Sequence, residues 1–219
     1  MIDVMDIVKL IDNSLLRPNA TVREVLEFVR RSSEAGFYAV CVQPFHVRTA
    51  RENAFNGTKV CSVVGFPHGL SPKEIKVREA VKAVLDGAEE IDMVMNISAF
   101  KSGNFRYVEE EIKAVKRETG AILKVIIETC YLTREEKLRA VDICIEGGAD
   151  FVKTSTGFGP AEATPDDVKL LKERSGDRIK VKASGGIRDL RTALSMIEAG
   201  ADRIGTSSGF EIYRELTGG

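Results

Sequence analysis

The sequence predicts an α/β protein whose chain closes into a single (β/α)8 barrel, with a short N-terminal helix. Eight short apolar runs recur along the chain, and their starts lie 21 to 32 residues apart. A βαβ unit takes about 30 residues. A Gly-Ala-acid triplet also returns at every second run. Eight units in 219 residues leave room for short loops and no additional domain, so residues 1–219 are expected to form one TIM-barrel domain.

The predicted strands are rich in β-branched residues, and most are apolar throughout rather than alternating. Continuous apolar runs are typical of parallel strands that are covered on both faces. In chain order the runs are residues 10–16, 38–42, 59–64, 90–94, 122–127, 150–154, 179–183 and 202–206. The first run is the weakest candidate.

Capping signals predict helices between these strands. Thr21, Ser71 and Thr133 are each followed three residues later by a glutamate, which is the spacing of a capping box. Pro72 and Pro165 suit the first helical position, where a missing N–H costs nothing. Left-handed glycines are expected to end helices at positions 36, 87, 148 and 200.

The triplets begin at Gly87, Gly148 and Gly200, and residues 35–37 are a degenerate fourth copy. Neighbouring copies are two units apart, so four copies indicate eight units. The alternative is an open doubly wound sheet. It is less favoured because no G-x-G-x-x-G motif follows the first strand.

Composition excludes several classes of protein. The chain has 32 Lys and Arg against 33 Asp and Glu, which gives no electrostatic case for a nucleic-acid or acidic-membrane partner. The first residues lack the basic region of a secretory signal. The four cysteines form no C-x-x-C pair, and the two histidines are not spaced as a metal pair. We therefore expect a cytoplasmic protein with reduced thiols and no zinc site.

Charged residues inside the predicted strands point to chemistry. Lys153, Lys182, Lys124, Asp92 and Asp12 all lie within strand runs. Buried charges are costly, and apolar layers would serve stability better. Active sites of this fold lie at the carboxyl ends of the strands. The five residues therefore predict an active site rather than a structural layer.

Neighbouring lysines suggest a Schiff-base nucleophile. Two ammonium groups 5–7 Å apart repel by about 2.4–3.3 kcal/mol at an effective dielectric constant of about 20. This repulsion is expected to lower the pKa of one lysine, so that its neutral amine attacks a carbonyl group. The residue pattern alone leaves open which lysine is the nucleophile.

Glycine and hydroxyl groups follow the last three predicted strands. Glycines allow backbone N–H groups to approach an anion, and helix N-termini add a favourable dipole. Loops after strands seven and eight form the usual phosphate site of this fold. The sequence therefore predicts phosphate binding by the loops at residues 154–159, 184–188 and 205–209.

These residues lie in motifs that resemble the deoxyribose-phosphate aldolase family along essentially the full chain. The segments are LIDNSLL (10–16), YAVCVQP (38–44), VVGFPHG (63–69), EIDMVMN (90–96), LKVIIET (123–129), ADFVKTSTGFG (149–159), KVKASGGIRD (180–189) and RIGTSS (203–208). The strings FVKTSTG and VKASGGIR at this spacing are highly specific.

The resemblance implies reversible cleavage of 2-deoxy-D-ribose 5-phosphate to acetaldehyde and D-glyceraldehyde 3-phosphate, in nucleoside catabolism, without a metal or organic cofactor. Lys153 matches the Schiff-base lysine, and Lys182 the lysine that lowers the pKa of that nucleophile. Asp92 matches the acid that moves protons with a water molecule. Asp12 and Lys124 match polar residues that line the site. The family's phosphate contacts match Gly157, Gly185, Gly186, Arg188, Ser207 and Ser208. A homo-oligomer, either a dimer or a tetramer, is expected.

The sequence also departs from the family. Some members carry a lysine where Phe158 stands, so phosphate binding here rests more on backbone dipoles and Arg188. Some members end in a tail with a terminal tyrosine, whereas this chain ends Leu216-Thr217-Gly218-Gly219. Two other functions stay open: a phosphosugar isomerase on the same barrel, and a catalytically inactive barrel that serves as a binding protein.

Overall fold

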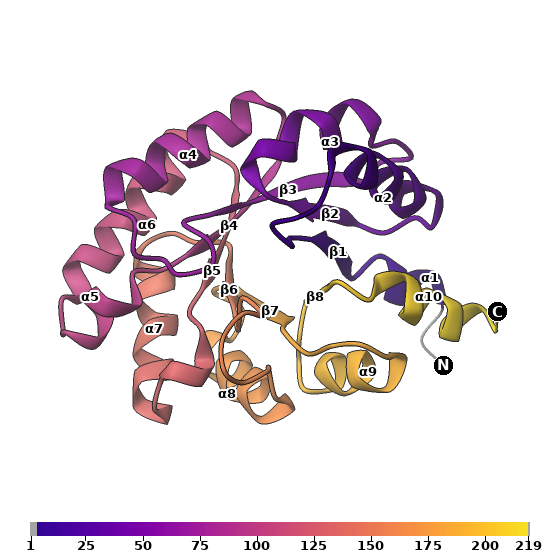
Figure 1. Ribbon diagram of the computed structural model, residues 1–219. Helices are drawn as coiled ribbons and strands as arrows, with labels where there is room; N and C mark the ends of the chain where they lie inside the picture. Colours follow the sequence, from indigo (N-terminus) through magenta and orange to yellow (C-terminus); the bar gives the residue numbers. More distant parts are fainter. Residues whose placement is uncertain (1–3, 219) are drawn as a thin grey trace.

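The computed structural model describes residues 4–218 and contains a closed barrel of eight parallel strands (Figure 1). The strands pair in chain order, and the last pairs with the first. They are β1 (Ile11–Leu15), β2 (Ala39–Val42), β3 (Lys59–Val64), β4 (Glu90–Val94), β5 (Ile122–Ile126), β6 (Phe151–Lys153), β7 (Lys180–Ser184) and β8 (Arg203–Thr206). The (β/α)8 prediction is confirmed, and the open-sheet alternative is wrong.

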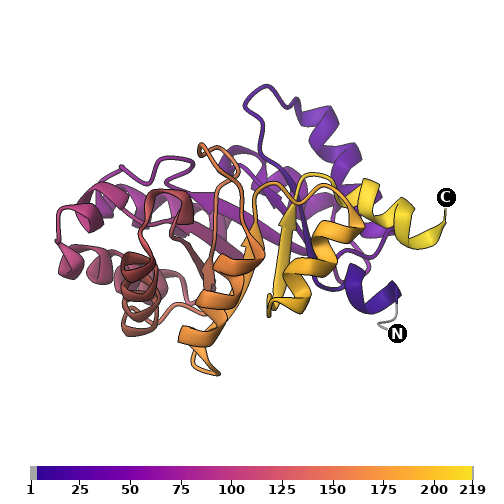
Figure 2. The same ribbon diagram turned by 90° about the horizontal axis from the view of Figure 1, so that it is seen from below.

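Helices surround the barrel in both views (Figures 1 and 2). They are α1 (Val4–Val8), α2 (Val22–Glu34), α3 (Val47–Asn53), α4 (Lys73–Leu85), α5 (Ile97–Lys101), α6 (Phe105–Thr119), α7 (Arg134–Glu146), α8 (Pro165–Ser175), α9 (Leu190–Glu198) and α10 (Gly209–Thr217). The expected short N-terminal helix is α1, which lies beside α10 at the same side of the barrel. Within residues 4–218, no helix is long and apolar enough to cross a membrane.

Alternate residues of each strand face two different environments, as the two-residue period of a strand requires. In β4, Ile91 and Met93 belong to the apolar core that also contains residues of the surrounding helices. Glu90 and Asp92 face the barrel interior, where both approach Lys124 of β5. These four β4 residues are at most 1% exposed. Strand β4 is therefore buried on both faces, and its inner face is charged.

The helix caps follow the sequence signals with one exception. Thr21 and Thr133 form complete capping boxes with Glu24 and Glu136. Pro165 is the first residue of α8, as predicted. The predicted box at Ser71 is wrong, and so is the first helical position for Pro72. The extended Pro72 precedes α4, and the Lys73 N–H donates instead to Tyr107 Oη at 2.9 Å.

Candidate active site

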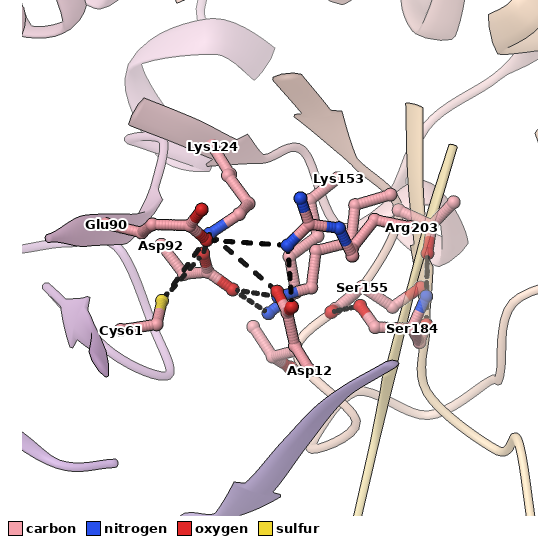
Figure 3. A network of polar contacts seen from close by, with 12 residues as sticks. Asp12, Cys61, Glu90, Asp92, Lys124, Lys153, Ser155, Ser184 and Arg203 are labelled. Atoms are coloured by element: carbon pink, nitrogen blue, oxygen red, sulfur yellow. Dashed lines mark hydrogen bonds and ion pairs between the residues drawn. The ribbon is translucent and has the colours of Figure 1, made fainter. Parts of the chain in front are cut away.

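Strand register brings the predicted charges to neighbouring levels of the barrel. Asp92 is paired with Lys124 across β4 and β5, and Lys153 with Lys182 across β6 and β7. Asp12 of β1 joins them across the interior, with Lys182 Nζ 2.5 Å from Asp12 Oδ2. The five predicted strand charges therefore form one connected network (Figure 3).

Asp92 is the centre of this network. Its Oδ2 atom lies 2.7 Å from Lys153 Nζ and 2.8 Å from Lys182 Nζ. Its Oδ1 atom accepts a hydrogen bond from Lys124 Nζ at 2.9 Å. The side chain has no exposed surface. One buried carboxylate thus holds all three lysines.

Two further charges, Glu90 and Arg203, lie in the same network and were missed from the sequence. Lys124 Nζ lies 2.5 Å from Glu90 Oε2, and an Arg203 N–H donates to Asp12 Oδ1 at 2.8 Å. Arg203 also stacks 3.5 Å above the Tyr38 ring. A usable signal was present, because Glu90 is two residues from Asp92 and so lies on the same strand face. These additions bring the network to four cations and three carboxylates.

The carboxylates dominate the electrostatics of the lysines. Burial works to lower the pKa of Lys182, but attraction to Asp12 and Asp92 outweighs it and raises that pKa above its ordinary value. The same balance raises the pKa of Lys124. Burial would raise the pKa of Asp92, but the three lysines hold it well below its usual range. For Lys182, attraction to the two carboxylates therefore outweighs the repulsion that was expected from a neighbouring ammonium group.

A cavity of about 470 Å³ opens at the carboxyl ends of the strands. Lys153, Ser184 and Thr206, the last residues of β6, β7 and β8, all line it. Eight of the predicted site residues reach its wall: Asp12, Lys153, Lys182, Gly157, Gly185, Gly186, Arg188 and Ser207. Lys124, Asp92 and Ser208 are not among its lining residues. Asp92 lies beneath the wall and contacts Lys153 and Lys182, whereas Lys124 contacts Asp92.

Glycines shape one side of the cavity. Gly157 and Gly185 have φ angles of +83° and +93° and lie against each other, so that a Cβ at Gly157 would be 3.8 Å from the Gly185 Cα. Residues other than glycine rarely adopt such φ angles. Helix α10 begins nearby without a side-chain cap from Ser208. Uncapped N–H groups at a helix start favour an anion.

Arg188 has a partner that the sequence did not predict. Its guanidinium pairs with the carboxylate of Glu162, and both side chains are more than half exposed. Glu162 also covers Gly186, where an added Cβ would be 2.3 Å from the Glu162 carboxyl carbon. An anion that enters this part of the cavity must therefore displace a carboxylate.

Comparison with known proteins identifies the family to which this barrel belongs. The sequence profile of the DeoC/LacD family aldolases matches residues 5–215. The chain belongs to the DeoC/LacD aldolase family. A deoxyribose-phosphate aldolase of Aquifex aeolicus (strain VF5) is 57% identical over 214 residues, which are 97% of each chain.

Solved structures agree with membership of the DeoC/LacD family. An aldolase called QR15 superimposes with a TM-score of 0.95 at 57% identity, over 97% of this chain and 96% of its own. The deoxyribose phosphate aldolase from Aeropyrum pernix, described as having a unique tetrameric structure, gives a TM-score of 0.91 at 34% identity. That match covers 98% of this chain and 92% of the other.

The Glu128 side chain supports the loop that carries Gly157. The residue has a left-handed φ of 53° directly after β5 and is 2% exposed. Its carboxylate accepts from the Thr156 backbone N–H at 3.2 Å and from the Thr156 hydroxyl at 2.5 Å. The carboxylate fixes the start of the β6–α8 loop.

Replacing Glu128 with Gln is expected to lower the free energy of unfolding by about 1–3 kcal/mol. The amide keeps one acceptor oxygen but turns the other into a donor, so a buried Thr156 donor loses its partner. Denaturant unfolding measures the loss. Glu173→Gln on the exposed face of α8 is the control and should stay within about 0.5 kcal/mol of the wild type. Equal effects of both changes would argue against a supporting role for Glu128.

Proposed function

We propose that this chain is a deoxyribose-phosphate aldolase that cleaves 2-deoxy-D-ribose 5-phosphate reversibly to acetaldehyde and D-glyceraldehyde 3-phosphate. Family membership and the 57% identical relative of that name support the activity. The observation that carries the proposal is the position of Lys153. Its amine lies at the wall of the cavity and contacts a buried carboxylate that also holds Lys182.

Lys153 is the nucleophile because the other two lysines are unsuited. Lys124 has no exposed surface, and Lys182 is bound between two carboxylates that raise its pKa, so both stay ammonium groups. Lys153 is 4% exposed, lines the cavity and pairs with Asp92. A carbonyl carbon in the cavity therefore meets Lys153 first.

The charged network accepts and donates protons during the reaction. The Lys153 amine adds to the C1 aldehyde and water leaves, which forms an iminium ion. A base then takes the C3 hydroxyl proton, C3 becomes the carbonyl carbon of D-glyceraldehyde 3-phosphate, and this product leaves. The electrons of the broken C2–C3 bond form the C1=C2 double bond of an enamine. Asp92, through a water molecule, takes that proton, and Lys182 beside it helps to return a proton to C2. Hydrolysis releases acetaldehyde and restores Lys153.

Phosphate binding is assigned to the loops after β6, β7 and β8. Gly157, Gly185, Gly186 and Ser207 line the cavity, and the uncapped start of α10 follows Ser208. Arg188 adds a cation once Glu162 moves away. The loops after β6, β7 and β8 thus hold the phosphate, which positions C1 at Lys153.

Arg188→Ala is expected to raise the KM for 2-deoxyribose 5-phosphate about tenfold, because a charge-assisted hydrogen bond is lost at an exposed site. Unphosphorylated 2-deoxyribose should be much less affected. Glu162→Ala is the matched variant: it frees Arg188 and should lower the KM for the phosphorylated sugar alone. Steady-state kinetics on both sugars measures these effects. Equal changes for the two sugars would mean that Arg188 only supports the loop.

Further features are part of the same proposal. Residues 1–219 act as one catalytic domain that works in the cytoplasm, without a metal or organic cofactor. Its substrate is a small phosphorylated sugar, with no nucleic-acid or membrane partner. The chain forms a homo-oligomer, a dimer or a tetramer, for which the tetrameric Aeropyrum pernix aldolase is a precedent.

The direct test is an assay for products. The purified protein is incubated with 2-deoxy-D-ribose 5-phosphate, and D-glyceraldehyde 3-phosphate is measured by coupled oxidation while acetaldehyde is measured by reduction. Equal amounts of the two products support the aldolase. Isomerised pentose phosphate without acetaldehyde would indicate the isomerase, and no reaction would indicate the inactive barrel.

A further inference from the structure

Two free thiols lie next to the charged network, and the proposed reaction does not use them. Cys41 and Cys61 belong to neighbouring strands and are paired in register across β2 and β3. Both face the barrel interior, in a small cluster with Val63 that is separate from the main apolar core. Cys61 Sγ donates toward Asp92 Oδ1 at 3.1 Å (Figure 3).

The two sulfur atoms and a carboxylate oxygen of Asp92 form a compact ligand set. All three atoms lie within 4.8 Å of one another. A tetrahedral zinc ion with Zn–S bonds of about 2.3 Å holds neighbouring sulfur ligands about 3.8 Å apart. Small side-chain movements therefore suffice to place the three atoms around one ion.

An ion can reach this group through the substrate cavity. Cys41 is 2% exposed and lines the cavity together with Asp12, Lys153 and Lys182. The three protein ligands leave a fourth position on the cavity side for water. Zinc sites with three protein ligands and one open position are a common arrangement.

We propose that Cys41, Cys61 and Asp92 form an inhibitory site for a soft divalent cation such as Zn²⁺ or Cd²⁺. Thiolates select soft cations over Mg²⁺ and Ca²⁺, which prefer oxygen ligands. The site is distinct from a cofactor site, because an ion held there engages the carboxylate that the lysines need.

Charge balance sets the protonation change on binding. The charged network that contacts Cys61 through Asp92 and Lys124 consists of Asp12, Glu90, Asp92, Lys124, Lys153, Lys182 and Arg203, with a formal sum of +1. When the cation forms two metal–sulfur bonds, two S–H bonds break and two protons go to solvent, with no change of oxidation state. The local charge then stays at +1.

Inhibition follows from the loss of Asp92 and rests on the proposed aldolase function. Lys124 Nζ lies 2.9 Å from the same Oδ1 atom and 3.6 Å from Cys61 Sγ, so the ion displaces this ammonium group. The charge of Asp92 is then shared with the metal, and it no longer serves Lys153 and Lys182 as a base.

The test measures binding separately from activity. The apoprotein is titrated with Zn²⁺ in competition with a chromophoric chelator, and the bound zinc is examined by X-ray absorption. We expect one ion per chain with two sulfur ligands at about 2.3 Å. Cys41→Ala and Cys61→Ala should each weaken binding about 100-fold or more, since even loss of an outer-shell partner costs 10–100-fold. Cys130→Ala, which removes a partly exposed thiol outside the ligand set, is the control and should bind normally.

Each outcome decides the proposal. The proposal is overturned if Cys61→Ala still binds zinc, if Cys130→Ala loses binding, or if the bound zinc lacks two sulfur ligands. It is also overturned if the wild type does not bind zinc at micromolar concentration. Cys61→Ser and thermal unfolding of each variant separate ligand loss from misfolding. If zinc binds as expected but the protein does not cleave the sugar, the metal site stands and the proposed function fails.

Discussion

Borohydride reduction in the presence of acetaldehyde is expected to leave one two-carbon adduct on the protein, and peptide mapping should place it on Lys153. Acetaldehyde is the smallest carbonyl compound that forms the proposed iminium ion, and reduction makes the bond permanent. Lys153→Leu should remove the adduct and lower kcat by about 10⁴-fold or more, the scale seen when a catalytic nucleophile is removed. Mass spectrometry and the product assay measure both effects.

Two controls make the result specific to Lys153. Lys169→Leu changes an exposed lysine on α8 and should keep both the adduct and the activity. Lys182→Leu leaves no amine at position 182 that could carry an adduct. It should also slow the reaction, because it removes a proton donor next to Asp92. An adduct on Lys182 of the wild type would exchange the roles of the two lysines. Adducts spread over surface lysines would remove the Schiff-base mechanism.

The periodic part of the structure could be predicted from the sequence because it depends on local patterns. The predicted strand runs recur about every 30 residues, and glycines end several of the helices between them. Every expected run overlaps an observed strand. The charged strand residues could also be found, because a lysine such as Lys153 inside a buried strand has a high desolvation cost. Such a cost marks a residue as functional without showing its partners.

Contacts across the barrel could not be predicted in the same way. Asp12 and Arg203 are 191 positions apart, yet their side chains form a hydrogen bond. The pKa of Lys182 is raised by Asp12 and Asp92, although two lysines considered alone would lower it. The pairing of Arg188 with Glu162 depends on how two loops approach each other. Local sequence carries little information about such approaches.

Asp92→Asn is expected to combine a loss of activity with a loss of stability. The amide cannot act as a base, so kcat should fall about 10²–10⁴-fold, the range for a general acid–base group. The change also leaves four buried cations facing two carboxylates. Removing one partner of a buried ion pair costs about 3–5 kcal/mol, and the similar size and one acceptor oxygen of Asn favour the lower end. Asp142→Asn, which breaks the surface pair with Arg174, should cost at most about 1 kcal/mol.

The pH dependence of this stability difference tests the electrostatic cause. The three lysines hold the pKa of folded Asp92 well below the ordinary value of 3.8. A lowered folded pKa gives stability that is fully present above the unfolded pKa and is lost as the pH falls through the folded pKa. The gap in unfolding free energy between wild type and Asp92→Asn should therefore be constant from neutral pH down to about pH 5 and shrink below pH 4. A gap that widens on acidification would mean that Asp92 is protonated more easily in the folded state, and that the three lysines are not held by its charge.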